Sequence, residues 1–205
     1  MKRIFICIAM LLSLAACSPK SPYADDASVA RAVYSPGPPN SITLFTVLSN
    51  RNNSGAHTGL LINASQRVMF DPAGTWRHPR IPERNDVHYG MTDKMVNFYI
   101  DYHARETYRV IEQTIYVTAE QAEIALQRAQ SYGAVPKTQC ARSVSNILRG
   151  VPGFENMPAT LFPKKLMNAF GSLPGVTERT IRDEDADKNY GVLLVQAGEG
   201  ATDSP

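Results

Sequence analysis

The chain has 205 residues, of which 43% are hydrophobic, a share typical of one globular domain. Its formal net charge is +2 at pH 7, and its basic residues do not gather in a stripe. This balance excludes the strongly basic proteins that bind nucleic acid.

Residues 1–16 are typical of an export signal. Two basic residues precede an apolar run over 4–14, which is shorter than the roughly 20 residues that span a bilayer. The run ends in Leu-Ala-Ala-Cys over 14–17, which resembles the lipobox cut by the lipoprotein signal peptidase. The resemblance implies that Cys17 becomes the lipid-bearing N-terminus. An ordinary cleaved signal without lipid is the alternative.

Lipidation of Cys17 predicts a bacterial envelope protein anchored to a membrane, because more than one acyl chain gives stable anchoring. Ser18 stands where an aspartate usually means inner-membrane retention, which favours the outer membrane, facing the periplasm. Cys7 leaves with the signal, so Cys140 is the only free thiol of the mature chain. An unpaired thiol in an exported protein indicates either a reactive cysteine or a small buried apolar residue.

Composition divides the rest of the chain into three parts. Residues 17–40 are rich in Ser, Pro and Ala and predict a flexible tether, with a short helix around 26–33. Residues 41–195 predict one domain, and residues 196–205 a disordered tail.

The domain is predicted to begin with strands. Runs rich in β-branched and aromatic residues predict strands over 42–48, 57–62, 66–71, 109–117 and 190–195. Residues 72–92 predict a long irregular excursion, and residues 95–102 fit a strand or a short helix equally well.

Helices are predicted in the second half of the domain. Thr118 and Gln121 form a capping box that starts the first helix. A second helix begins at Cys140, and a third covers 163–170. Strands first, helices later and a closing strand predict an α+β fold, with helices packed on an antiparallel sheet.

Three residues are predicted to meet. A hairpin turn centred on Ala64 would place His57 opposite Asp71, because the residue numbers of opposed antiparallel pairs have a constant sum. A carboxylate beside an imidazole fixes its tautomer and stabilises its charged form. The start of the Cys140 helix carries partial positive charge and free amides, which stabilise a thiolate and an oxyanion. This arrangement is typical of thiol hydrolases.

The segment His-Thr-Gly-Leu-Leu-Ile over 57–62 resembles the histidine strand of NlpC-type papain-like proteins. The cysteine segment over 139–144 follows this strand, as in the circularly permuted branch, which includes lecithin retinol acyltransferase-like proteins and several bacterial lipoproteins. A further helix near 163–166 would follow the cysteine helix in that branch. The resemblance covers roughly 42–170 and implies a permuted papain-like fold.

The resemblance also implies roles: Cys140 as nucleophile, His57 as general base and Asp71 as the orienting third residue. The third residue of the family usually falls closer to the histidine, near Met69, so Asp71 requires a longer turn. These roles imply a cysteine hydrolase of amide or ester bonds that works through a thioester acyl-enzyme.

Several alternatives stay open. The enzyme would be an amidase or peptidase acting on peptidoglycan stem peptides, or an acyltransferase acting on a lipid ester. A non-catalytic envelope protein could instead use the same fold as a binding module, or serve a structural role in a larger assembly. No cofactor or metal is expected, because the histidines lack close spacing and one thiol makes a poor zinc set. The histidines expected at the surface are His78, His88 and His103. Trp76 and Tyr89 fit a substrate groove or a packed loop.

Overall fold

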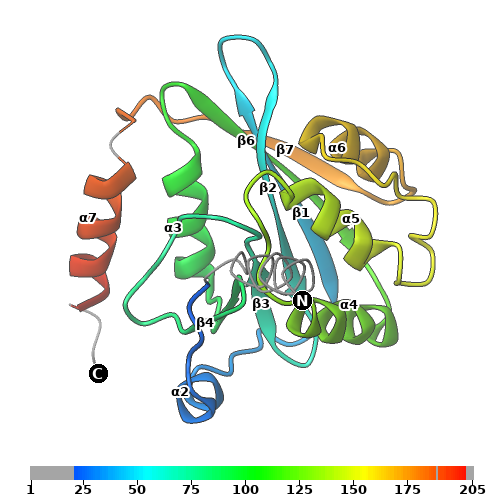
Figure 1. Cartoon of the computed structure of the whole chain (residues 1–205), viewed down its shortest axis with the longest axis horizontal. Helices are drawn as coiled ribbons and strands as arrows, with labels where there is room; N and C mark the ends of the chain where they lie inside the picture. The colour runs from blue at the N-terminus through cyan, green and yellow to red at the C-terminus, as the bar shows by residue number, and fades with distance from the viewer. Residues whose placement is uncertain (1–20, 188, 202–205) are drawn as a thin grey trace, which may run out of the picture.

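The computed structural model describes residues 21–187 and 189–201. The expected signal peptide over 1–16 and the lipid site at Cys17 lie outside the described residues. Within them the fold is α+β, as predicted, with helices packed against a seven-stranded antiparallel sheet (Figure 1). No helix in this part of the chain is both long and apolar enough to cross a membrane.

The strands follow the order β4-β5-β3-β2-β1-β6-β7 across the sheet. Their bounds are Ser41–Ser49 for β1, Gly55–Asn63 for β2, Arg67–Phe70 for β3, Glu83–Arg84 for β4, Val87–Tyr89 for β5, Tyr108–Tyr116 for β6 and Thr177–Ile181 for β7. The helices are Asp26–Arg31 for α2, Asp93–His103 for α3, Ala119–Ser131 for α4, Cys140–Leu148 for α5, Pro163–Gly171 for α6 and Asn189–Ala201 for α7.

Helices bury both faces of the central strands, which explains why β1 is buried almost throughout. Side chains alternate between the two faces of a strand. Ile42 and Leu44 of β1 pack in the core beneath α4, α5 and α6. Phe45 and Val47 pack in a second core beneath α3, with α7 outside it (Figure 1).

The helices predicted from capping and spacing are present. The capping box of Thr118 and Gln121 starts α4, and both of its hydrogen bonds form. Helix α5 begins at Cys140, as predicted. Residues 95–102, whose sequence fitted either a strand or a short helix, belong to α3. The excursion over 72–92 is less irregular than expected, because it contains the short strands β4 and β5.

The prediction for the C-terminus was wrong. Residues 190–195, expected as a strand, and 196–201, expected as disordered, form most of α7. Gln196 is buried and accepts a hydrogen bond from the Trp76 indole, which ties this helix to the domain. The pattern failed because a short apolar run fits a buried strand and a helix equally well.

The segment before the sheet is docked on the domain from Ser21 onward, whereas a flexible tether was expected over 17–40. The Ser21 hydroxyl donates a hydrogen bond of 2.9 Å to Asp86, and α2 forms where the short helix was predicted. Proline and glycine exclude long regular elements here, but they leave this segment free to dock through hydrogen bonds. The expected tether is therefore part of the folded structure from residue 21.

Candidate active site

His57 and Asp71 form an ion pair at the end of the β2–β3 hairpin. Nε2 of His57 lies 2.6 Å from Oδ1 of Asp71, and the Asp71 side chain is completely buried. His57 lies in β2, and Asp71 follows the last residue of β3. The contact orients the imidazole ring and leaves its other nitrogen for a second partner.

The two residues meet although the predicted register was wrong. The strands pair Leu60 with Phe70, so the hairpin turn centres one residue beyond Ala64. Moving the centre by one residue moves each opposed partner by two positions, which keeps it on the same face of the sheet. His57 and Asp71 are therefore diagonal neighbours rather than directly opposed residues.

Helix α3 supplies another contact to the Asp71 carboxylate. The Tyr99 hydroxyl donates a hydrogen bond of 3.0 Å to Oδ1 of Asp71. The other oxygen, Oδ2, is buried without a hydrogen-bond partner among the described residues, and Nε2 of His88 lies 4.0 Å away. His88 is 2% exposed, so its expected place at the surface was wrong. Asp71 is thus enclosed by ring side chains rather than by water.

Two glycines make room for this arrangement. A Cβ atom on Gly59 would overlap the Tyr99 hydroxyl, and a Cβ atom on Gly74 would overlap the Asp71 carboxylate. The glycine two residues after His57 therefore has a steric role, because any side chain there would push Tyr99 away from Asp71.

Cys140 stands at the N-terminus of α5, after an irregular loop. The N-cap residue Gln139 makes no side-chain capping bond, so its side chain does not occupy the first amides of the helix. Thr138 has a φ of 72°, which is strained for a β-branched residue. Such a conformation persists only where the surrounding structure enforces it, and here it lies two residues before Cys140.

The environment of Cys140 favours the thiolate. Burial raises the pKa of the thiol, but the hydrogen bond and charge of His57 outweigh it and hold the pKa below its ordinary value. The backbone amides of Thr58 and Ala141 act in the same direction. His57 therefore forms an ion pair with Asp71 and also acts electrostatically on Cys140.

The pKa of His57 is set by burial, which lowers it, and by Asp71, which raises it. Burial lowers this pKa, but the charge and hydrogen bond of Asp71 outweigh it and raise the pKa to about 10. Burial raises the pKa of Asp71, and His57 outweighs that effect and keeps it below its ordinary value. Together with the lowered pKa of Cys140, these shifts favour a thiolate–imidazolium pair over a neutral thiol and imidazole.

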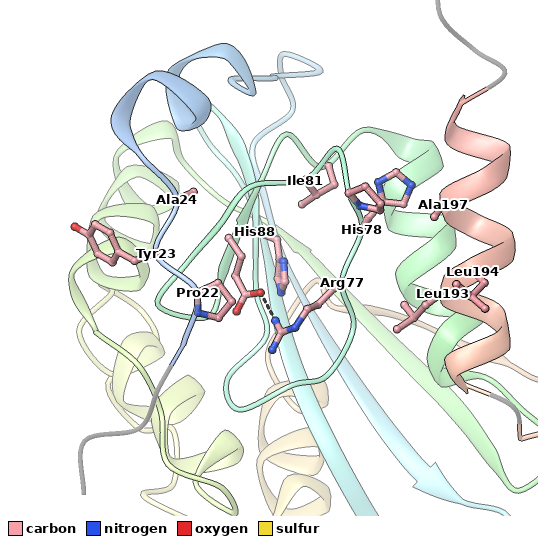
Figure 2. A pocket seen from close by; sticks show the side chains of 12 residues that line it. Pro22, Tyr23, Ala24, Arg77, His78, Ile81, His88, Leu193, Leu194 and Ala197 are labelled. Carbon is pink, nitrogen blue, oxygen red and sulfur yellow. Dashed lines mark hydrogen bonds and ion pairs between the residues drawn. The ribbon is translucent and has the colours of Figure 1, made fainter. Parts of the chain in front are cut away.

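A cavity of about 630 Å³ lies beside His88 (Figure 2). His88 forms part of its wall, opposite apolar residues of α7, and neither Cys140 nor His57 lines it. His78 also lines the cavity and is 5% exposed, so it too was wrongly expected at the surface. Trp76 is completely buried beside His88, which makes it a packing residue rather than part of an open groove.

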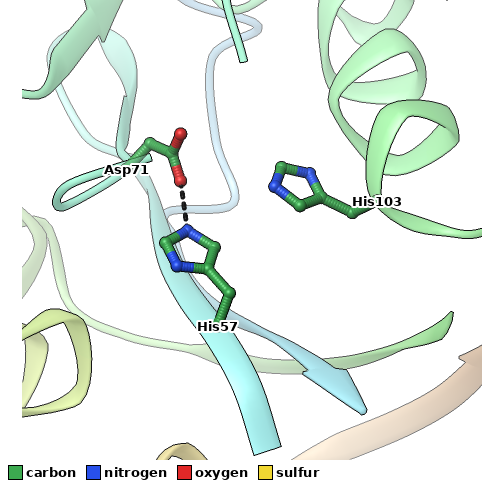
Figure 3. A group of neighbouring side chains, drawn as sticks. All are labelled: His57, Asp71 and His103. Carbon is green, nitrogen blue, oxygen red and sulfur yellow. Dashed lines mark hydrogen bonds and ion pairs between the residues drawn. The ribbon is translucent and has the colours of Figure 1, made fainter. Parts of the chain in front are cut away.

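Among the residues that the structure describes, two groups of side chains are close enough to hold a metal ion. Ligand atoms of His57, Asp71 and His103 lie within 4.8 Å of one another (Figure 3). The second group is Asp101, Asp183 and Asp185. His103 is half-buried, and its ring stacks on that of His57 with 5.5 Å between ring centroids.

The described geometry brings together the three residues that the sequence singled out and adds groups that it missed. Tyr99 lies on a helix far along the chain, and no motif connects it with His57. Comparisons with protein-family models, with curated proteins and with solved structures found no match. The arrangement itself is able to generate a thiolate, orient its proton acceptor and present helix amides to a developing oxyanion.

Proposed function

We propose that the chain is a cysteine hydrolase that cleaves amide or ester bonds and is anchored to the bacterial envelope through Cys17. The observation that carries this proposal is the His57–Asp71 ion pair, with His57 on a strand that packs against the helix beginning at Cys140. The segments around His57 and Cys140 also resemble those of the circularly permuted NlpC-type papain-like family, whereas Asp71 departs from the usual spacing of its third residue.

The chemistry begins from the thiolate–imidazolium pair. The Cys140 thiolate attacks the substrate carbonyl carbon, and the carbonyl oxygen becomes an oxyanion facing the amides at the start of α5. The intermediate collapses to a thioester, and the imidazolium of His57 gives its proton to the departing amine or alcohol. Water, deprotonated by His57, then attacks the thioester and releases the acid and the thiol. Asp71 holds the ring throughout.

The substrate is an amide or ester reached from the envelope side. Peptidoglycan stem peptides suit an enzyme anchored to the outer membrane and facing the periplasm. A lipid ester is the alternative, in which an acyl acceptor replaces water and the reaction becomes an acyl transfer.

A second candidate is a non-catalytic envelope protein that uses the domain as a binding module. The observation that favours it is the low exposure of Cys140, of which only 7% is accessible. A nucleophile must be reached by a carbonyl carbon, whereas a thiol in a binding module can remain enclosed.

The rate of Cys140 alkylation by iodoacetamide as a function of pH separates the two. The full chain, purified in detergent, is labelled and digested, and the Cys140 peptide is quantified by mass spectrometry, so that Cys7 and Cys17 do not contribute. We expect fast labelling well below the ordinary thiol pKa of about 8.5 and its loss in His57→Ala. Labelling only after denaturation would refute the hydrolase and favour the binding module.

A further inference from the structure

The Asp71 carboxylate offers more acceptor capacity than its protein contacts use. Its Oδ1 atom accepts from His57 and Tyr99, while Oδ2 is buried without a hydrogen-bond partner among the described residues. Leaving a buried charged oxygen unpaired is expensive, which suggests that another positive species approaches it.

His103 lies beside this carboxylate in one defined tautomer. Its Nδ1 atom is 2.8 Å from the backbone carbonyl oxygen of Tyr99. A carbonyl only accepts, so Nδ1 carries the hydrogen and Nε2 carries a lone pair. Figure 3 shows the outer ring nitrogen of His103 directed toward the His57–Asp71 pair. An imidazole whose second nitrogen donates to a backbone carbonyl is the usual state of a metal-binding histidine.

We propose that His57, Asp71 and His103 bind one zinc-like divalent transition metal ion and that this ion switches off the thiol chemistry of Cys140. Two imidazoles and one carboxylate are a common zinc ligand set, with solvent in the fourth position. The ligand atoms lie within 4.8 Å of one another. Around a tetrahedral ion they would be about 3.4 Å apart, so small side-chain rotations complete the site.

Metal binding competes directly with the thiol chemistry. The ion takes the place of the proton on Nε2 of His57, and one proton is released for each ion bound. The charge of the ion then lies beside Cys140 and lowers the pKa of the thiol further, and the nucleophilicity of a thiolate falls as the thiol pKa falls. This regulatory consequence rests on the proposed hydrolase function, whereas the metal site itself does not.

Calorimetric titration of the full chain with Zn²⁺ tests the site directly. We expect one ion bound per chain, with affinity reduced at least about tenfold in His103→Ala and unchanged in the control His78→Asn, since His78 lies outside the cluster. Co²⁺ in place of Zn²⁺ should give a visible absorption band in the wild type that is lost in His103→Ala. Absence of stoichiometric binding, or equal binding by the wild type and His103→Ala, would overturn the proposal.

Two further readouts locate the ion and show its effect. Zn²⁺ binding that survives in Cys140→Ser supports the proposed ligands, while binding lost in that variant and kept in His103→Ala would place the metal on the thiol and refute them. Zn²⁺ should slow Cys140 alkylation in the wild type but not in His103→Ala. If Cys140 is already unreactive in zinc-free protein, the hydrolase proposal fails, and the titration still decides the metal site.

Discussion

The hydroxyl of Tyr99 occupies the space that a Cβ atom on Gly59 would need. The same hydroxyl donates to Asp71, and Asp71 orients His57. A residue without a side chain in β2 is therefore required for a contact made by α3. Gly59 of the His-x-Gly sequence therefore affects the His57–Asp71 ion pair only by leaving space for Tyr99.

Gly59→Ala should displace Tyr99 from Asp71 and destabilise the fold by about 1–3 kcal/mol. Urea denaturation measures the loss. Gly198→Ala is a matched control, because nothing lies within 4 Å of the Cβ position there and the residue is in a helix. Equal stability of Gly59→Ala and the wild type would show that Tyr99 can move without consequence.

Asp71→Asn should remove the charge that keeps His57 protonated and lower its pKa from about 10. With less imidazolium beside it, the Cys140 thiolate should form at higher pH. We expect the alkylation rate at pH 6 to fall at least about tenfold, which is one unit of pKa. Asp93→Asn, on an exposed carboxylate that pairs with Arg67, should leave the profile unchanged. Identical profiles for Asp71→Asn and the wild type would exclude Asp71 as the orienting residue.

His88 should make the fold sensitive to acid. Burial lowers the pKa of His88 to about 4 from an ordinary 6.5. Between these values the unfolded chain binds a proton that the folded chain does not, so stability falls as the pH falls. One such histidine lowers the free energy of unfolding by about 3 kcal/mol once the pH is below both pKa values. Denaturation midpoints from pH 7 to 4 should have a shallower slope in His88→Gln, and an unchanged slope would contradict this assignment.

Thr138→Gly should stabilise the protein, although it removes a side chain. Relief of the positive φ is worth about 1–2 kcal/mol, and the extra freedom of glycine in the unfolded chain offsets about half of it. A net gain of about 0.5–1 kcal/mol should raise the thermal midpoint. Asn53→Gly, at a φ of 59°, should gain less, because asparagine tolerates this region. A destabilised Thr138→Gly variant would mean that side-chain contacts outweigh the strain.

Local patterns predicted the parts of the site that depend on local physics. The start of α5 at Cys140 follows from helical spacing after a proline loop. Asp71 could be selected despite a wrong turn centre, because strand parity survives a shift of two positions. Tyr99 and His88 could not be found in this way, since they reach Asp71 only through tertiary packing. Helix α7 was missed because its short run of apolar residues is compatible with a buried strand as well as with a helix.

The docking of Ser21 onto Asp86 limits how far the domain stands from any lipid on Cys17. From Cys17 to Ser21 a fully extended chain spans at most about 14 Å. The domain would then work close to the lipid headgroups rather than at the end of a long flexible linker. Bonds that never approach the bilayer would be out of reach, so the choice of substrate would depend on height above the membrane as well as on chemistry.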